Sequence, residues 1–98
     1  MMTEANTAMT DLVLTPIADI KVETIDGELL LYHPRQTKAI YLNPTAAIIW
    51  SLCDGQRRVG EIIQLIADSY PESKDNLAED VFTTLRELRD NGVLRTVS

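Results

Sequence analysis

Apolar and polar residues alternate over residues 20–24, which is the period of a β-strand whose side chains point to opposite faces of a sheet. Asp26-Gly27 follows directly, and this dipeptide is typical of a two-residue hairpin turn. The apolar run Leu29–Tyr32 supplies the partner strand, and Ala39–Leu42 is a third short segment of strand-forming residues. The pattern predicts a three-stranded antiparallel meander.

From residue 43 onward the apolar positions recur at helical spacing. Asn43-Pro44 places a preferred N-cap residue before proline at the first helical position, which predicts a central, largely apolar helix over 44–52. A second helix is expected over 59–70, although Arg58 stands where Ser or Thr would usually cap it. A third is expected over 77–91, with its apolar stripe at Leu77, Val81, Leu85 and Leu88.

The two ends of the chain have different patterns. Residues 1–16 have no sustained period and are expected to form a disordered N-terminal segment, in which Leu12, Val13 and Leu14 are a short docking stretch. One folded domain is expected over 17–98, ending in a short extended tail that packs Val93, Leu94 and Val97 against the core. Three strands, three helices and a tail predict an α+β domain of winged-helix-like shape.

Length and charge narrow the class of protein. The 98 residues suffice for one domain, and the net charge of -6 opposes binding to nucleic acid, which depends on neutralising phosphates. No stretch approaches the roughly 20 apolar residues that span a bilayer, and the first ten residues lack the features of a signal peptide. We therefore expect a cytoplasmic protein without membrane contact, as a monomer or a weak dimer through an unpaired strand edge.

Candidate catalytic and metal-binding residues are few. His33 and Cys53 are the only histidine and the only cysteine, so neither has the partners that a metal site or a nucleophilic pair requires. His33 is expected on a surface loop and Cys53 as a small buried hydrophobe, while the acidic residues of the third helix indicate a solvated face. The glycines are isolated, which excludes a phosphate-binding loop. The sequence predicts no enzyme, no cofactor and no metal.

Two aromatic residues carry expectations about packing. Trp50 lies in the largely apolar helix and is expected in the core. If Ile40 and Leu42 point inward, alternation along the strand places Tyr41 on the outer face. An outward tyrosine on an edge strand is equally consistent with a binding surface and with a simple covering of the sheet.

Several short segments occur in an order and spacing that resemble the PqqD-like family. They are Leu42-Asn43, Ile49-Trp50, Asp54-Gly55, Val59-Gly60-Glu61-Ile62, Asp80-Val81 and Asn91-Gly92-Val93-Leu94. The resemblance covers about residues 17–94 and implies a domain of three strands and three helices. It also implies a RiPP recognition element, which binds the leader segment of a ribosomally made precursor peptide and delivers it to a tailoring enzyme, often a radical SAM enzyme.

The resemblance further implies where the leader binds, as a strand added beside the third strand and against the third helix. Carried onto this sequence, the strand side comprises Thr37, Lys38, Ala39, Ile40, Tyr41 and Leu42. For the helix wall we expect one flank of the apolar stripe, comprising Phe82, Leu85, Arg86 and Arg89, because exposed apolar side chains beside arginine suit an amphipathic, acidic leader. The opposite flank, at Thr84, is the alternative.

One departure from the family bears on the pathway. Members committed to pyrroloquinoline quinone carry a Leu-Ala-Pro-Glu segment in the second strand and its loop, whereas this chain has Leu31-Tyr32-His33-Pro34-Arg35. The departure favours another peptide natural product.

Two other functions remain open from sequence alone. One is a winged-helix DNA-binding regulator, although the expected recognition helix sets two arginines against four acidic residues. The other is an adaptor that binds only the enzyme.

Overall fold

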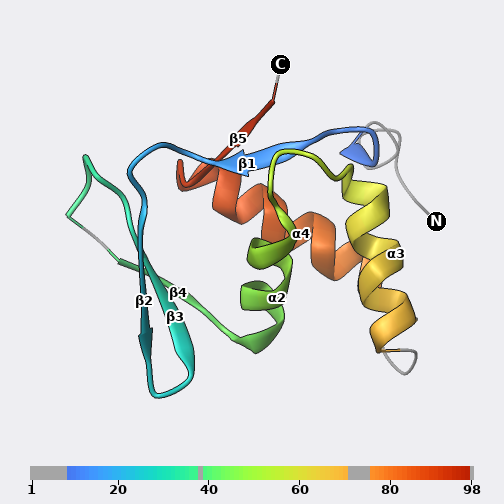
Figure 1. The fold of residues 1–98 in the computed structure, drawn as a ribbon, viewed down its shortest axis with the longest axis horizontal. Helices are drawn as coiled ribbons and strands as arrows, with labels where there is room; N and C mark the ends of the chain where they lie inside the picture. Colours follow the sequence, from blue (N-terminus) through green and yellow to red (C-terminus); the bar gives the residue numbers. More distant parts are fainter. Residues whose placement is uncertain (1–8, 38, 71–75, 98) are drawn as a thin grey trace.

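The computed structural model describes residues 9–37, 39–70 and 76–97. Its elements are, in chain order, β1 (Leu14–Pro16), β2 (Lys21–Ile25), β3 (Glu28–Tyr32), β4 (Ala39–Leu42), α2 (Pro44–Leu52), α3 (Val59–Ser69), α4 (Leu77–Asp90) and β5 (Leu94–Thr96). The antiparallel sheet β2-β3-β4 stands beside the three helices, and β1 pairs with β5 in a second, smaller sheet (Figure 1). The expected α+β fold, with its three-stranded sheet and three helices, is confirmed.

The hairpin between β2 and β3 forms as expected. Asp26 and Gly27 both have positive φ, 52° and 80°, which is the conformation of a type I′ turn. The paired residues Ile25 and Glu28 close this two-residue loop, and β3 then pairs antiparallel with β4. The turn thus fixes the register between β2 and β3.

β3 and β4 pack one face of the sheet against α2, whereas every residue of β2 is exposed. Leu31 and Leu42 are buried in the core and Ile40 packs against it. Tyr41 points away from the core and 63% of its surface is exposed, so the expected alternation along this strand is confirmed.

The first residues of α2 and α3 are capped in different ways. The Asn43 side chain accepts a hydrogen bond from the backbone N–H of Ala46 at 2.8 Å, as its N-cap position predicts. Arg58 supplies no such cap, but the Glu61 carboxylate accepts a hydrogen bond from the backbone N–H of Arg58 at 3.0 Å. This is one half of a capping box, and it compensates for the unfavourable residue at the start of α3.

One core joins the three helices to the inner face of the sheet. Trp50 is buried in it, as expected, together with Ile49, Val59, Ile62, Val81, Phe82, Leu85 and Leu88. Across the ranges described above, no helix has both the length and the hydropathy that crossing a membrane requires.

The beginning of the chain departs from the expectation of a disordered segment. The expectation is wrong for β1, because Leu14 is fully buried and pairs with Thr96 of β5. The carbonyls of Leu12 and Leu14 also accept hydrogen bonds from the N–H groups of Val59, at 2.9 Å, and Gly55, at 3.1 Å. The segment thus belongs to the fold because it has backbone partners on both sides. Residues 1–8 lie outside the described residues.

The end of the chain agrees in part with the expectation of a tail packed against the core. Val93 and Leu94 are buried as expected. Val97 is 39% exposed rather than buried, and its backbone N–H donates to the carbonyl of Val13 at 2.8 Å.

Candidate functional site

The outer edge of β4 presents backbone groups that have no strand beside them in the described part of the chain. In a hairpin with a two-residue loop, the closing pair Ile25–Glu28 exchanges hydrogen bonds, and bonding pairs then alternate along the strands. Alternation directs the backbone groups of Leu29 and Leu31 toward β4, where their partners are Leu42 and Ile40. The N–H and C=O groups of Ala39 and Tyr41 therefore face outward.

A groove lies beside the end of this strand. It has a volume of about 320 Å³ and is lined by Asn43, Thr45, Asp80, Thr83 and Thr84. Near the other end of β4, Gln36 lies close to Gly92, since a Cβ on Gly92 would come within 4.0 Å of the Gln36 side chain. The end of β4, at Asn43, and the Asp80–Thr84 flank of α4 thus lie on either side of this space, which we call the β4–α4 groove.

The structure corrects the expected helix wall. Phe82 and Leu85 are both 0% exposed, so the expectation that they offer an apolar surface to a peptide is wrong. The reason is that α4 packs against α2, α3 and β5 at once, which buries a wider arc of the helix than one stripe. Arg86 and Arg89 are exposed, but the groove is lined by Thr83 and Thr84, on the flank that had been the alternative.

The other expected site residues that the structure describes lie on β4 or just before it, and none of them lines the groove itself. Thr37 and Ala39 are exposed, Ile40 is half-buried and Leu42 is buried. Lys38 lies outside the described residues. No signal in the sequence distinguished the two flanks of α4, because that depends on which neighbouring elements cover the helix.

The two residues with potential reactivity have structural roles. The Nδ1 atom of His33 accepts a hydrogen bond from the backbone N–H of Arg35 at 3.0 Å, which stabilises the loop after β3. Cys53 is buried as expected, and its thiol donates to the carbonyl of Ile49 at 3.3 Å. Burial, with a smaller contribution from the charge of Asp54, raises the pKa of Cys53 to about 12. Backbone N–H donors, Gln56 first, lower the pKa of Asp54 itself.

We expect Cys53 of the native protein to resist alkylation by iodoacetamide at pH 8, because a thiol with this pKa forms almost no reactive thiolate there. Mass spectrometry should show labelling only as fast as the protein unfolds, and full labelling in denaturant. The raised pKa also favours the folded state below pH 9, and this contribution is lost as the pH rises toward 12. Rapid labelling under native conditions would contradict the burial.

The open edge of β4, walled by α4, defines a class: a small α+β domain with a surface suited to adding a strand. The profile of the family described as "Coenzyme PQQ synthesis protein D (PqqD)" matches residues 28–94, more than half of the chain. The chain therefore belongs to the PqqD family, as the resemblance in its sequence indicated.

One curated relative and two solved structures are similar to the chain. The "PqqA binding protein" of Gluconobacter oxydans (strain 621H) is 41% identical over 59 residues, which are 60% of this chain and 62% of the relative's length. "TbiB1 in Complex with the TbiA(beta) Leader Peptide" has a TM-score of 0.72 at 24% identity, covering 86% of this chain and 98% of that one. The PqqD truncation of Methylobacterium extorquens PqqCD, described as a RiPP recognition element, has a TM-score of 0.70 at 19% identity, covering 89% and 92%. At these identities the two structures establish the shared fold.

Proposed function

We propose that the protein binds the leader segment of a ribosomally synthesised precursor peptide as a strand added to β4, and presents it to a modifying enzyme without performing chemistry itself. The observation that carries the proposal is the pair of outward backbone positions, Ala39 and Tyr41, on an edge next to the β4–α4 groove. Main-chain bonds to such an edge supply affinity, and the neighbouring pockets select side chains. The relative named for PqqA binding and the leader-peptide complex of TbiB1 support it.

The wall of the groove bears on which leaders fit. Its side chains are the carboxylate of Asp80, two threonine hydroxyls from α4, and Asn43 and Thr45 from the opposite side. Arg86 and Arg89, which would attract an acidic leader, do not line it. A leader with polar or basic residues beside the Leu42 end of β4 is therefore favoured over an acidic one.

The partner enzyme is proposed to be a radical SAM enzyme, as the family resemblance implies. The Methylobacterium relative is a truncation of a longer protein, PqqCD, which supports a role for this fold alongside another polypeptide unit. Copurification of the protein with the enzyme encoded beside its gene, with and without the precursor, tests this pairing. An adaptor would bind the enzyme but not the peptide.

A DNA-binding role finds no support on the surface of α4. Its exposed surface sets four carboxylates against two arginines, Arg86 and Arg89, so the net charge of the helix would repel the phosphates of a duplex.

The proposal is tested by titrating ¹⁵N-labelled protein with synthetic Gluconobacter PqqA and with each short peptide encoded near the gene. We expect saturable amide shifts at Thr37, along 39–42, and on the Asp80–Thr84 flank of α4. If no peptide binds, the function is wrong. If one binds but shifts cluster at the β2–β3 turn or on the first turns of α3, the site is wrong.

A substitution in the wall distinguishes the two flanks of α4. Thr84→Arg places a long cationic side chain into the groove, and we expect it to weaken binding of the active peptide about tenfold or more in isothermal titration calorimetry, by blocking the added strand. Arg86→Glu is the matched control on the other flank, where affinity should change less than threefold or so because an exposed charge away from the interface contributes little. The reverse order of effects would restore the Arg86 flank as the wall.

A further inference from the structure

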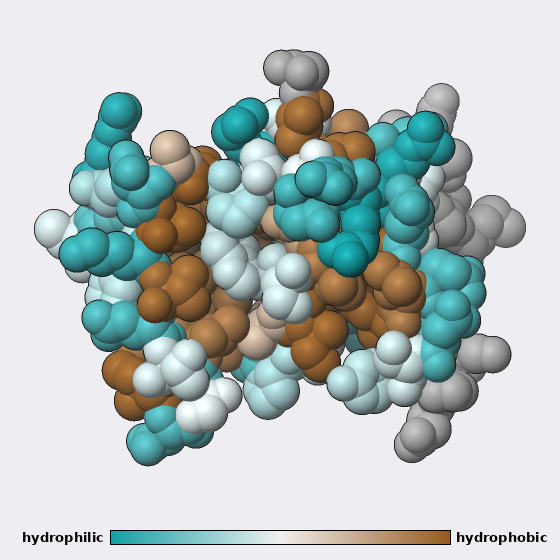
Figure 2. Space-filling model, viewed as in Figure 1, coloured by the Kyte–Doolittle hydropathy of each residue, from teal (hydrophilic) through white to brown (hydrophobic). Residues whose placement is uncertain are grey.

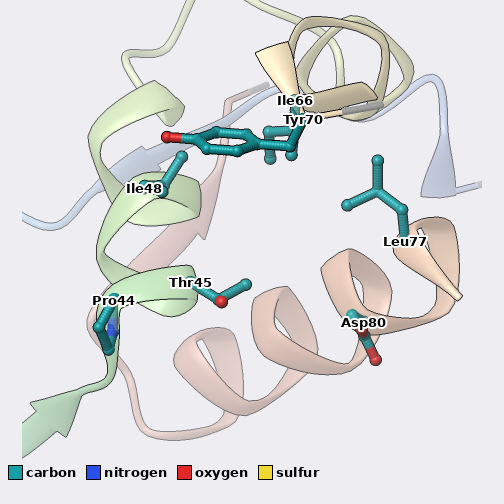
Figure 3. Close-up of a pocket in the computed structure, with 7 residues that line it drawn as sticks. All are labelled: Pro44, Thr45, Ile48, Ile66, Tyr70, Leu77 and Asp80. Carbon is teal, nitrogen blue, oxygen red and sulfur yellow. The ribbon is translucent and has the colours of Figure 1, made fainter. Parts of the chain in front are cut away.

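A second, more apolar pocket lies among the three helices. It has a volume of about 400 Å³, which is within the usual range for ligand pockets. Its apolar walls come from Ile48 of α2, Ile66 and Tyr70 at the end of α3, and Leu77 at the start of α4. Figure 3 shows these side chains arranged around one gap, with Thr45 and Leu77 directed into it.

This pocket continues the β4–α4 groove. Thr45 and Asp80 line both, so the two spaces meet between the first turn of α2 and the first turns of α4. Asn43, which also lines the groove, follows directly after β4. A peptide paired with β4 that runs on past Leu42 therefore reaches the pocket within a few residues.

The chemistry of the pocket differs from that of the groove. The groove is polar, whereas the pocket is walled by two isoleucines, a leucine and a tyrosine ring. Tyr70 is 47% exposed, so its ring is accessible at the mouth of this pocket. Figure 2 shows that apolar side chains gather over α2 and α3 on this face. Asp80 lies at the junction of the two spaces, and its carboxylate points away from the gap that the apolar side chains surround (Figure 3).

We propose that this pocket is a side-chain subsite that takes one bulky aromatic residue of the bound leader, at the point where the peptide passes beyond the Leu42 end of β4. The inference rests on the proposed function for the identity of its occupant. It adds a second specificity element, because strand pairing with β4 uses backbone groups and selects few side chains. The pocket then fixes the register of the leader along the strand.

The test uses a probe that does not need strand pairing. N-acetyl-L-tyrosinamide is titrated into ¹⁵N-labelled protein, with N-acetyl-L-alaninamide as the control probe. We expect saturable shifts with an apparent Kd on the order of 1 mM, concentrated at Thr45, Ile48, Tyr70 and Asp80. The alanine probe should produce no saturable shifts.

A matched pair of variants distinguishes binding in the pocket from nonspecific binding to exposed apolar residues near α3. Tyr70→Ala removes one wall and should weaken binding of the tyrosine probe at least about fivefold. Leu65→Ala removes a comparably exposed apolar side chain, 41% against 47%, that does not line this pocket, and it should bind the probe as the wild type does. Circular dichroism checks that both variants keep the fold.

The outcomes separate this inference from the proposed function. Localised, Tyr70-dependent shifts support the subsite whichever precursor the protein binds. Shifts elsewhere, no saturation, or equal binding by Tyr70→Ala overturn it, even if leader binding at β4 is established by the titrations described above. Conversely, a failure of every peptide to bind would leave an aromatic pocket without the occupant proposed for it, and so overturn the assignment to a leader.

Discussion

The Phe82→Ala variant is expected to lose about 3–5 kcal/mol of the free energy of unfolding, because it empties a fully buried site in the packed core. Phe82 lies where α4 meets its neighbours and has no exposed surface from which a peptide contact could be made. Denaturation in urea, followed by the fluorescence of the single tryptophan, Trp50, measures the change.

Arg86→Ala is the control for this prediction. It lies one turn further along α4 on the exposed surface, and its unfolding free energy should change by about 0.5 kcal/mol or less. Equal stabilities of Phe82→Ala and the wild type would show that the phenylalanine lies on the surface, and would return it to the list of groove residues.

The Tyr41→Pro variant is expected to weaken binding of the cognate leader peptide by about tenfold or more, while the domain stays folded. Tyr41 directs its N–H outward, so proline removes a donor that an added strand needs and leaves a peptide carbonyl without its partner. The bonds between β3 and β4 involve Ile40 and Leu42 and remain available, since edge strands tolerate proline where the N–H faces away. Calorimetric titration with the peptide that binds the wild type measures the loss.

Two further substitutions on β4 act as controls for the backbone effect. Tyr41→Ala removes the same side chain but keeps the N–H, and its affinity should lie much closer to that of the wild type. Ile40→Pro removes a donor directed at β3, so it should disrupt the sheet itself and show up in the circular dichroism spectrum. If Tyr41→Ala and Tyr41→Pro lose affinity equally, the tyrosine ring rather than the strand edge binds the peptide.

The sequence predicted the elements of this fold closely because their signals are local. Asn43-Pro44 marks the start of α2, and Asp26-Gly27 requires a turn with positive φ at both positions. Each of these signals acts within a few residues, so no knowledge of the tertiary structure is needed to interpret it. The same holds for the outward direction of Tyr41, which follows from alternation alone.

The errors concern contacts between parts that are distant in sequence. In the sequence, Leu14 belongs to an N-terminal stretch without a regular pattern. It is part of a strand because it pairs with Thr96 and accepts a hydrogen bond from Gly55. Phe82 falls outside the simple stripe of α4, and it is buried because several elements cover the helix. Helical periodicity likewise reveals a buried face but not which neighbour lies on either side of it, so it could not show that Thr83 and Thr84 line the β4–α4 groove.

The pairing of β1 with β5 has a consequence for the order in which the chain folds. It joins Leu14 to Thr96, near opposite ends of the sequence, whereas the β2–β3 hairpin closes over two residues. Loop-closure entropy makes a contact of such long range costly until the chain between its ends has become compact. The hairpin and helices are therefore expected to form first. The β1–β5 ladder is expected to form last, after the rest of the domain has packed.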